Sequence, residues 1–409
     1  MTLTPALLRN YLTILSGSAG RLVLSLVYFL IIANGLSLAD FGVFAAASAA
    51  GVMAARALAF GFVSPLYRAA TVKPRLLGAY FAGFAALALA SLPLLALIGW
   101  GLHQALFAGR AAGWAIALIL FSEMVLWRLV EVVAIVNNGL NRFARAATLV
   151  IIGSGLRSLA AVGFWLWGGG GLGDWALAYL ACTALSAALA LGRYLPRARW
   201  RWRPALYRRR MGDAVAAAGA DMAFYVQSEL DKILVLSLAG PRSAGLYAIA
   251  LRVVDLTAMP IRSFNQMLVQ HVMAARSVVS GWRKRAGIEA GIGLVSIAGL
   301  VAVIILLWLW PNALGRNIGS AALLFPALLL VPAFRNLVEY HAELLYARER
   351  TASRMLLLIG LGALKAGLMT LVILAFAKIE AWALWLNPVF AIVWLVSAAV
   401  TYRLLAPAR

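Results

Sequence analysis

Residues 76–99 read LLGAYFAGFAALALASLPLLALIG, a run without a single charged side chain. At a rise of about 1.5 Å per residue, a helix over this run is long enough to cross the hydrocarbon core of a bilayer, which is about 30 Å thick. The run therefore predicts a membrane-spanning helix.

The whole chain has the same character. Of its 409 residues, 64% are hydrophobic and only 12% are charged, and its mean hydropathy is +0.92. A soluble globular chain carries about 25% charged residues, so a water-soluble fold is excluded. A membrane β-barrel would need alternating segments of about ten residues, which these continuous Leu, Ala and Val runs do not supply. The composition predicts an all-α integral membrane protein.

Apolar blocks bounded by glycine, proline or charge predict twelve transmembrane helices. They lie near residues 11–33, 41–62, 76–99, 114–136, 147–167, 172–193, 217–239, 244–264, 287–310, 320–341, 354–376 and 382–403. No loop between these blocks is long enough for a soluble domain, so we expect no catalytic module outside the membrane.

The charge balance is strongly basic, with 36 Lys and Arg against 14 Asp and Glu. Most bases fall in alternate loops, whereas the intervening loops hold only Arg110, Arg242, Arg316 and Lys378. Because basic loops stay on the cytoplasmic side, we expect both termini in the cytoplasm. The net charge of +22 is thus attributed to membrane orientation and contact with anionic lipids, not to nucleic acid. A single cysteine, Cys182, excludes an intramolecular disulfide.

Two segments of the first half recur in the second half. Residues 36–44, LSLADFGVF, correspond to 239–247, AGPRSAGLY, and residues 129–134, LVEVVA, correspond to 337–342, LVEYHA. Both pairs are separated by about half the chain, which indicates an internal duplication. Because each half holds an even number of predicted helices, the two halves enter the membrane in the same orientation, as parallel repeats.

Parallel repeats predict two six-helix lobes around a central cavity. We expect the first lobe over 1–193, a basic cytoplasmic linker over 194–213 and the second lobe over 214–409. The linker is rich in arginine and also carries Trp200 and Trp202, a pattern typical of segments that touch lipid headgroups.

The repeated outer turn carries a resemblance to a known family. With residues 229–236, ELDKILVL, it resembles the polysaccharide-transport branch of the multidrug/oligosaccharidyl-lipid/polysaccharide exporter superfamily. The nearest likeness is to the Wzx-like O-antigen and exopolysaccharide flippases, and it covers nearly the whole chain. The first turn departs from the family pattern, since Leu38 stands where proline is expected, whereas the second turn keeps Gly240 and Pro241.

The resemblance implies a flippase of the bacterial inner membrane. Such a protein moves an oligosaccharide linked to a polyprenyl pyrophosphate of the undecaprenyl type from the cytoplasmic to the outer leaflet by alternating access. Its partners would be this lipid, the membrane and the polysaccharide polymerase machinery. One alternative is a cation-coupled multidrug exporter of the same superfamily. Another, a membrane-embedded glycosyltransferase or polymerase with Glu123 and Asp221 as catalytic acids, is disfavoured by the repeat and by the missing outer domain.

Ionisable side chains inside the predicted helices are the candidate site residues, since each is costly in lipid and normally faces a cavity or a partner. The bases are Arg21, Arg56, Arg128, Arg157, Lys232, Arg252, Arg262, Arg335 and Lys365. Helical spacing of three or four residues predicts the pairs Arg128–Glu131, Arg252–Asp255 and Arg335–Glu339. We expect substrate binding by Arg21, Arg56, Arg157, Arg252 and Lys365. The family resemblance implies a pyrophosphate-binding role for Arg21, Arg56 and Arg252, a task that suits the donor fork of arginine.

Asp221 and Asp231 in the predicted helix 217–239 have two interpretations. Their carboxylates suit a coupling cation, H⁺ or Na⁺, or they balance the charge of cavity arginines. No phosphate-binding loop for ATP is present. His341 stands between Glu339 and Glu343, but a spacing of two residues turns these carboxylates to other helix faces. We therefore expect neither a metal nor a cofactor.

Overall fold

The computed structural model describes residues 23–274, 281–348, 350–376 and 378–406. Every regular element in these ranges is helical, which confirms an all-α multi-pass membrane protein. The chain divides into two compact units, Met1–Met222 and Ala223–Arg409. The two-lobe arrangement about a central cavity stays a prediction.

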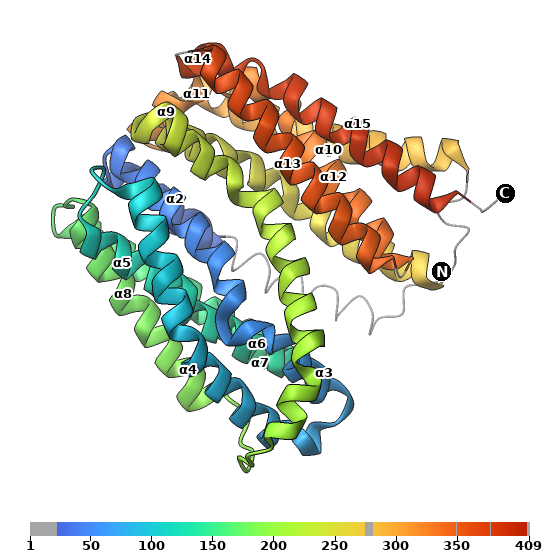
Figure 1. Ribbon diagram of the computed structural model, residues 1–409. Coiled ribbons are helices and arrows are strands. Elements are labelled where there is room, and N and C mark those ends of the chain that lie inside the picture. The colour runs from blue at the N-terminus through green and yellow to red at the C-terminus, as the bar shows by residue number, and fades with distance from the viewer. Residues whose placement is uncertain (1–22, 275–280, 349, 377, 407–409) are drawn as a thin grey trace. The chain divides into compact units, whose positions relative to one another are not determined.

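Unit 1 is a bundle of apolar helices (Figure 1). Its described elements, after the short apolar helix Val23–Gly35, are α2 (Leu38–Ala54), η1 (Ala55–Gly61), α3 (Val63–Val72), η2 (Pro74–Leu76), α4 (Leu77–Leu102), η3 (His103–Phe107), α5 (Gly113–Phe121), η4 (Ser122–Trp127), α6 (Arg128–Gly139), α7 (Phe143–Leu166), α8 (Leu172–Leu189), η5 (Ala190–Tyr194) and the first part of α9 (Pro204–Ala274). Helix α5 packs against α2 and α8, while α7 packs against α6 and α8.

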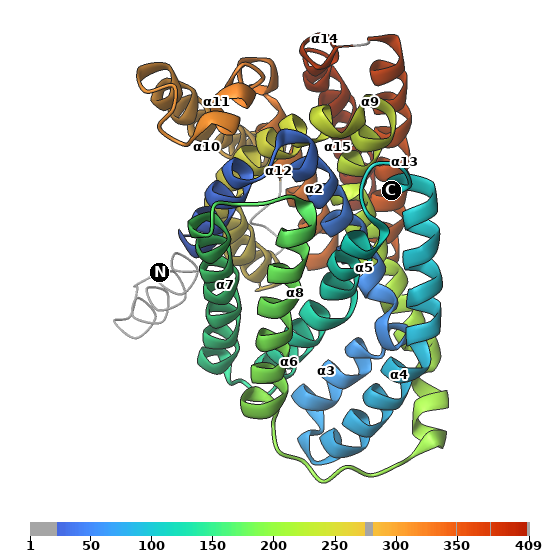
Figure 2. The same ribbon diagram turned by 90° about the vertical axis from the view of Figure 1, so that its left-hand side faces the viewer.

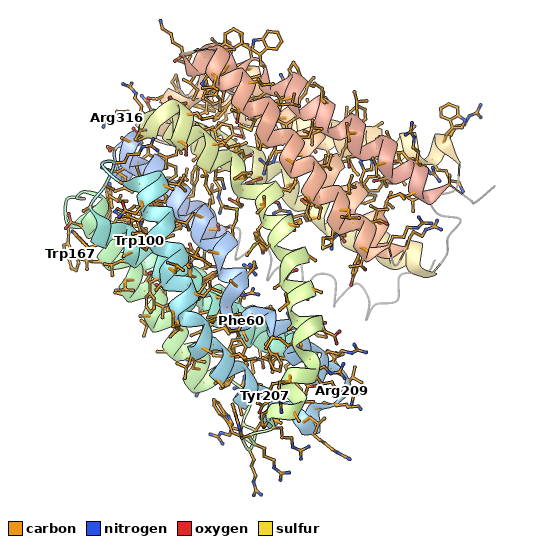
Figure 3. All side chains as sticks on the ribbon, in the orientation of Figure 1. Phe60, Trp100, Trp167, Tyr207, Arg209 and Arg316 are labelled. Atoms are coloured by element: carbon orange, nitrogen blue, oxygen red, sulfur yellow. The ribbon has the colours of Figure 1, made fainter. Side chains whose placement is uncertain are left out.

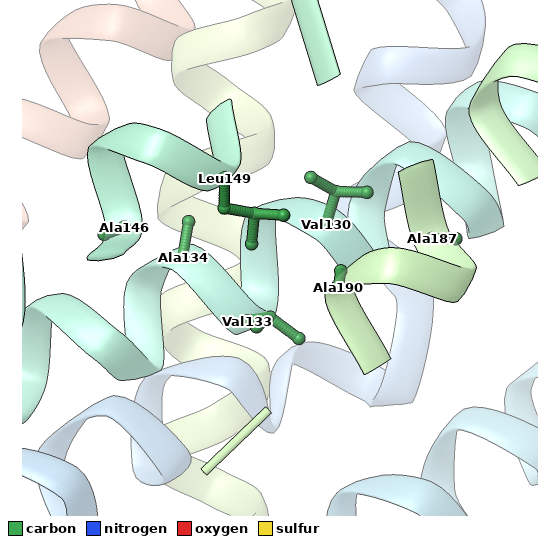
Figure 4. Close-up of a cluster of buried hydrophobic side chains, with 7 residues drawn as sticks. All are labelled: Val130, Val133, Ala134, Ala146, Leu149, Ala187 and Ala190. Carbon is green, nitrogen blue, oxygen red and sulfur yellow. The ribbon is translucent and has the colours of Figure 1, made fainter. Parts of the chain in front are cut away.

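Small side chains let the helices of unit 1 approach closely. One buried cluster joins α6, α7, α8 and η5, and alanines form more than half of it. Figure 4 shows these side chains, which are Val130, Val133, Ala134, Ala146, Leu149, Ala187 and Ala190. Since lipid is as apolar as a helix surface, such close packing, and not hydrophobic burial, holds membrane helices together.

A sharp break separates α2 from α3. Ala59 and Phe60 adopt left-handed backbone conformations, with φ of 53° and 50°, and Gly61 follows with φ of 78°. The break frees backbone groups from the helix ladder, and the Ala59 N–H donates to the Ser91 hydroxyl at 3.0 Å. This internal partner is required because an unpaired N–H in lipid costs several kcal/mol.

Gly61 is required at this break for two reasons. Its φ disfavours any side chain, and a Cβ there would lie 2.4 Å from the carbonyl oxygen of Ala214. Gly61→Ala is therefore expected to destabilise the protein by about 2–4 kcal/mol, combining left-handed strain with overpacking. The measurement is the thermal unfolding midpoint of the purified protein in detergent.

Gly101→Ala in α4 is the matched control. In the part of the chain that the structure describes, no heavy atom lies within 4 Å of a Cβ at this position, and the backbone is helical. Because alanine favours a helix over glycine, this variant should unfold at or above the wild-type temperature. Equal losses in the two variants would refute the steric account of Gly61.

The two ends of unit 1 differ in composition. Trp100 and Trp167 lie at one end, whereas Tyr207 and Arg209 lie at the other (Figure 3). Trp167 is 91% exposed, as expected for a ring at the level of the headgroups. Tyr207 is buried and donates its hydroxyl to the carbonyl of Ala79 at 2.9 Å. The second part of the predicted linker 194–213 is thus helical and packs on the start of α4.

In the described residues, unit 2 comprises the second part of α9 and seven further helical elements, of which Figure 2 labels the α-helices. Those that follow α9 are α10 (Trp282–Leu309), α11 (Arg316–Ala322), η7 (Pro326–Leu328), α12 (Val331–Ala347), α13 (Thr351–Ala375), α14 (Ile379–Ala383) and α15 (Leu386–Leu405). Helix α12 is central, since it packs against α10, α13 and α15. Within α9, Gly240 breaks the helix with φ of 82°.

The predicted count of twelve transmembrane helices is not confirmed. In the described residues, eight helices are long and apolar enough to cross a membrane, or nine if the bent pair Arg316–Ala322 and Pro326–Ala347 counts as one. The predicted span 11–33 begins outside the described residues. The predicted spans 217–239 and 244–264 both belong to α9, because the chain stays helical on either side of Gly240.

Candidate functional site

The first charged cluster of unit 1 joins two arginines to one carboxylate. Arg56 in η1 and Arg128 in α6 both contact the same oxygen, Glu131 Oε2, at 3.0 Å and 2.8 Å. The two arginines are buried, whereas the Glu131 side chain is 29% exposed. The predicted pair Arg128–Glu131 is confirmed, and Arg56 finds its anion on another helix.

The cluster retains an unused donor. Nε of Arg128 is buried and has no hydrogen-bond partner among the described residues. A carboxylate oxygen shared between two guanidiniums offers few acceptor sites, whereas a planar guanidinium fork is satisfied by two oxygens at once. The geometry therefore suits an anion with more oxygens than one carboxylate provides.

The second cluster of unit 1 surrounds Glu123, which is buried in the π-helical segment η4. It accepts hydrogen bonds from Ser48 at 2.7 Å and from Tyr179, and its other oxygen lies 3.6 Å from Arg157. The Arg157 guanidinium stacks 3.6 Å from the ring centre of Trp127. Arg157 thus has an internal carboxylate and an aromatic face, as buried cations require.

The charged cluster of unit 2 is centred on Asp231, whose side chain is fully buried. Lys365 Nζ lies 3.3 Å away and Arg335 Nη1 lies 3.5 Å away, while the Tyr247 hydroxyl donates at 3.1 Å. Arg335 also contacts Asp255 at 3.2 Å, and Lys365 donates to the carbonyl of Gln227. Two cations of the protein itself therefore occupy the coordination sphere of Asp231.

A cavity of about 280 Å³ lies beside this cluster within unit 2. Its charged lining residues are Glu229, Asp255, Arg262, Arg335, Glu339 and Lys365. Acids and bases are equally represented, so the walls can contact either sign of charge.

The candidate substrate-binding residues fall into three groups. Arg56, Arg157 and Lys365 each lie in an ion pair with an acid of a different helix. Arg252 is half-buried and has interactions within the protein. Arg21 lies outside the described residues.

The two candidate acids differ in environment. Asp221, the residue before the last of unit 1 in sequence, is exposed. Asp231 is buried among cations. Within unit 2, the geometry brings Asp231 together with Lys365 at 3.3 Å. The coupling and charge-balance interpretations of these acids stay predictions.

One predicted ion pair is wrong. Arg335 contacts Asp231 and Asp255 instead of Glu339, which contacts Arg262 at 3.1 Å. The physical reason is that Asp231, fully buried on a neighbouring helix, gains more from a nearby cation than Glu339, whose side chain is 25% exposed.

The two units share a pair of corresponding ion pairs that helical spacing alone does not reveal. Glu131 pairs with Arg56 in unit 1, and Glu339 pairs with Arg262 in unit 2. Glu131 and Glu339 occupy the same position in the repeated segments LVEVVA and LVEYHA. The arginines are separated by about the same half-chain interval. The duplication places these glutamates and arginines at matching positions of the two halves. That each glutamate pairs with an arginine of another helix is visible only in the fold.

Compared by sequence, the chain matches no protein-family model and no curated protein. Its fold is that of transporters of the multidrug/oligosaccharidyl-lipid/polysaccharide superfamily. A multidrug resistance MATE family transporter in an inward-facing conformation aligns with a TM-score of 0.61 and 17% identity, over 94% of this chain and 97% of that one.

Two further solved structures share the fold equally well. The lipid II flippase MurJ, in an inward closed conformation, has a TM-score of 0.63 and 12% identity over 95% of this chain and 86% of its own. The MATE multidrug transporter DinF-BH in complex with rhodamine 6G has a TM-score of 0.63 and 16% identity over 98% and 95%. These neighbours are transporters and not enzymes. At such identities the likeness shows the fold alone, so the polysaccharide branch stays a prediction.

Proposed function

We propose that this protein is a flippase for a lipid-linked oligosaccharide with a pyrophosphate head of the polyprenyl type. The proposal includes alternating access between two lobes, 1–193 and 214–409, joined by the linker 194–213. The shared fold with transporters supports the general class, and one of them is a flippase of lipid II. That fold does not choose between a lipid-linked sugar and a drug.

The observation that carries the proposal is the convergence of Arg56 and Arg128 on one oxygen of Glu131. A pyrophosphate has several terminal oxygens, so each guanidinium would have its own acceptors, including one for Nε of Arg128. Because Glu131 is the most exposed member of the cluster, it is the group that an arriving anion displaces. Charge-assisted bonds of this kind are short and strong.

The second candidate function is export of cationic drugs. It is favoured by the three carboxylates Glu229, Asp255 and Glu339 on the wall of the unit 2 cavity. Each is within reach of a base of the protein, however: Glu229 contacts Lys232 at 2.6 Å, and Arg335 and Arg262 contact the other two. A cationic substrate would have to displace these bases.

Transport in proteoliposomes distinguishes the two functions. The probes are a fluorescent undecaprenyl-pyrophosphate-linked oligosaccharide, followed by its accessibility to a membrane-impermeant quencher, and the dye rhodamine 6G. We expect accelerated movement of the lipid and none of the dye. Movement of the dye alone would overturn the proposal in favour of the exporter.

Variants of Arg56 test the site itself. Arg56→Ala should slow lipid flipping at least tenfold, since the pyrophosphate loses a bidentate partner. Arg56→Lys should restore only part of the rate, because it keeps the charge but loses the fork. Arg75→Ala, at an exposed arginine of η2, is the matched control and should flip at the wild-type rate. All variants are compared after size-exclusion chromatography at equal reconstitution.

We also propose that the flippase works in the bacterial cytoplasmic membrane with both termini inside, alongside the polysaccharide polymerase machinery. The distribution of bases between alternate loops supports the orientation. Cysteine accessibility measured at single cysteines introduced at Lys73 and Arg110, in a Cys182→Ser background, would report on the two sides.

A further inference from the structure

A chain of hydrogen bonds connects three helices of unit 2. His341 of α12 is fully buried, and its Nδ1 lies 3.0 Å from the Ser397 hydroxyl of α15. Its Nε2 lies 3.0 Å from Oε1 of Glu289 on α10. The same Glu289 oxygen accepts a hydrogen bond from the Tyr402 hydroxyl of α15. The chain therefore runs from serine through imidazole to a carboxylate.

Neither metal binding nor nucleophilic catalysis accounts for this chain. Among the described residues, no three His, Cys, Asp or Glu side chains are grouped to hold a metal. The acids that flank His341 in sequence turn elsewhere, since Glu339 contacts Arg262 and Glu343 contacts Arg354. Ser397 is fully buried, so a substrate cannot reach its hydroxyl.

The arrangement satisfies both protonation states of the imidazole. In the neutral state, Nε2–H donates to Glu289 and the Ser397 hydroxyl donates to Nδ1. In the charged state, both ring nitrogens donate, and Ser397 becomes the acceptor by rotating its hydroxyl. Adding a proton therefore breaks neither contact of the ring and creates a buried ion pair with Glu289.

We propose that His341 and Glu289 form a proton-binding site of unit 2. Glu289 is 15% exposed while His341 is 0% exposed, so the carboxylate is the group through which a proton enters and leaves. The titratable and charged groups around the ring are Glu289 and Arg285 from α10, Tyr340 from α12 itself and Tyr402 from α15. Arg285 lies over the Tyr402 ring, 4.9 Å from its centre.

Proton binding at this place acts on the packing of the unit. Loading the site replaces a hydrogen bond from a neutral ring to the Glu289 carboxylate, between α12 and α10, with an ion pair between the charged ring and the same carboxylate, which strengthens that contact in a low-dielectric interior. Unloading weakens it. The site thus couples proton binding to the strength of the contact between α10 and α12, whatever substrate the protein carries.

Histidine NMR tests the proposal without a substrate. The chain contains three histidines, His103, His271 and His341, so full-length protein labelled with ¹⁵N-histidine in liposomes gives three ring signals. The variants His103→Gln and His271→Gln assign them. We expect the His341 signals to change from those of a singly protonated ring to those of a doubly protonated ring as the pH is lowered over the range in which the protein stays folded.

The role of the carboxylate is tested by Glu289→Gln. This variant should weaken the proton affinity of His341 at least tenfold, because the charged ring loses its counter-ion. Glu343→Gln is the matched control, because it removes an acid that lies on the helix of His341 but contacts Arg354. This variant should leave the titration of His341 in place. A His341 ring that holds one state throughout this pH range, or an equal response to both variants, overturns the proposal. If Glu289→Gln does not fold, the wild-type titration still decides.

Discussion

Asp231→Asn is expected to destabilise the protein by about 3–5 kcal/mol. Asparagine has nearly the same shape but no charge, so Lys365 and Arg335 would lose the carboxylate that both contact. Arg335 keeps Asp255 at 3.2 Å, whereas Lys365, only 1% exposed, would keep no ion pair with a carboxylate of the described residues. An uncompensated buried cation is the main cost of breaking such a pair.

The double variant Asp231→Asn/Lys365→Met separates this cause from general damage. It removes the stranded cation together with its anion, and methionine has a similar length to the lysine stem. Most of the lost stability should return. Thermal unfolding of purified wild type, both single variants and the double variant completes the cycle. If the double variant is as unstable as Asp231→Asn, the ion pair is not the source of the effect.

The second large effect concerns the membrane potential. If the substrate carries a pyrophosphate head with about two negative charges, an inside-negative potential favours its outward movement by about 4–5 kcal/mol per 100 mV. This corresponds to roughly a thousandfold change in the equilibrium distribution. This free energy is gained in full when the pyrophosphate charge crosses the entire transmembrane potential without an accompanying cation.

A potassium gradient with valinomycin across proteoliposomes sets the potential at zero or inside-negative. The fluorescent lipid-linked oligosaccharide is the probe, and vesicles without protein are the control. A potential-dependent end point is the expected result. Identical end points would show that the transported unit is electroneutral, which would direct attention to proton exchange at a site such as Glu289 and His341.

The sequence predicted the membrane class and the helical regions well, because hydrophobic runs report directly on the bilayer. It also predicted that bases inside the helices need anions. It did not identify those anions for Arg157 and Lys365, which turned out to be Glu123 and Asp231. Helical spacing reveals partners on one helix, whereas partners on other helices depend on packing.

The chain Glu289–His341–Ser397 shows the same limit. The residues are far apart in sequence, and the spacing around His341 excluded only its nearest acids. The sequence shows polar residues in each of these three apolar helices. It does not show which of them contact one another, because several pairings are compatible with helical spacing. The packing of α12 against both α10 and α15 selects the observed one.

Gly51 illustrates how such packing constrains the evolution of the chain. A Cβ at this position would lie 2.8 Å from Cβ of Glu123, so the carboxylate can stand beside Arg157 only while residue 51 has no side chain. Among related sequences, a larger residue at position 51 should accordingly occur with a glycine at 123, because every other residue keeps the Cβ that would clash. Such sequences should also lack the arginine at 157 or have another acid near it. Positions 51, 123 and 157, which are far apart in sequence, should therefore covary.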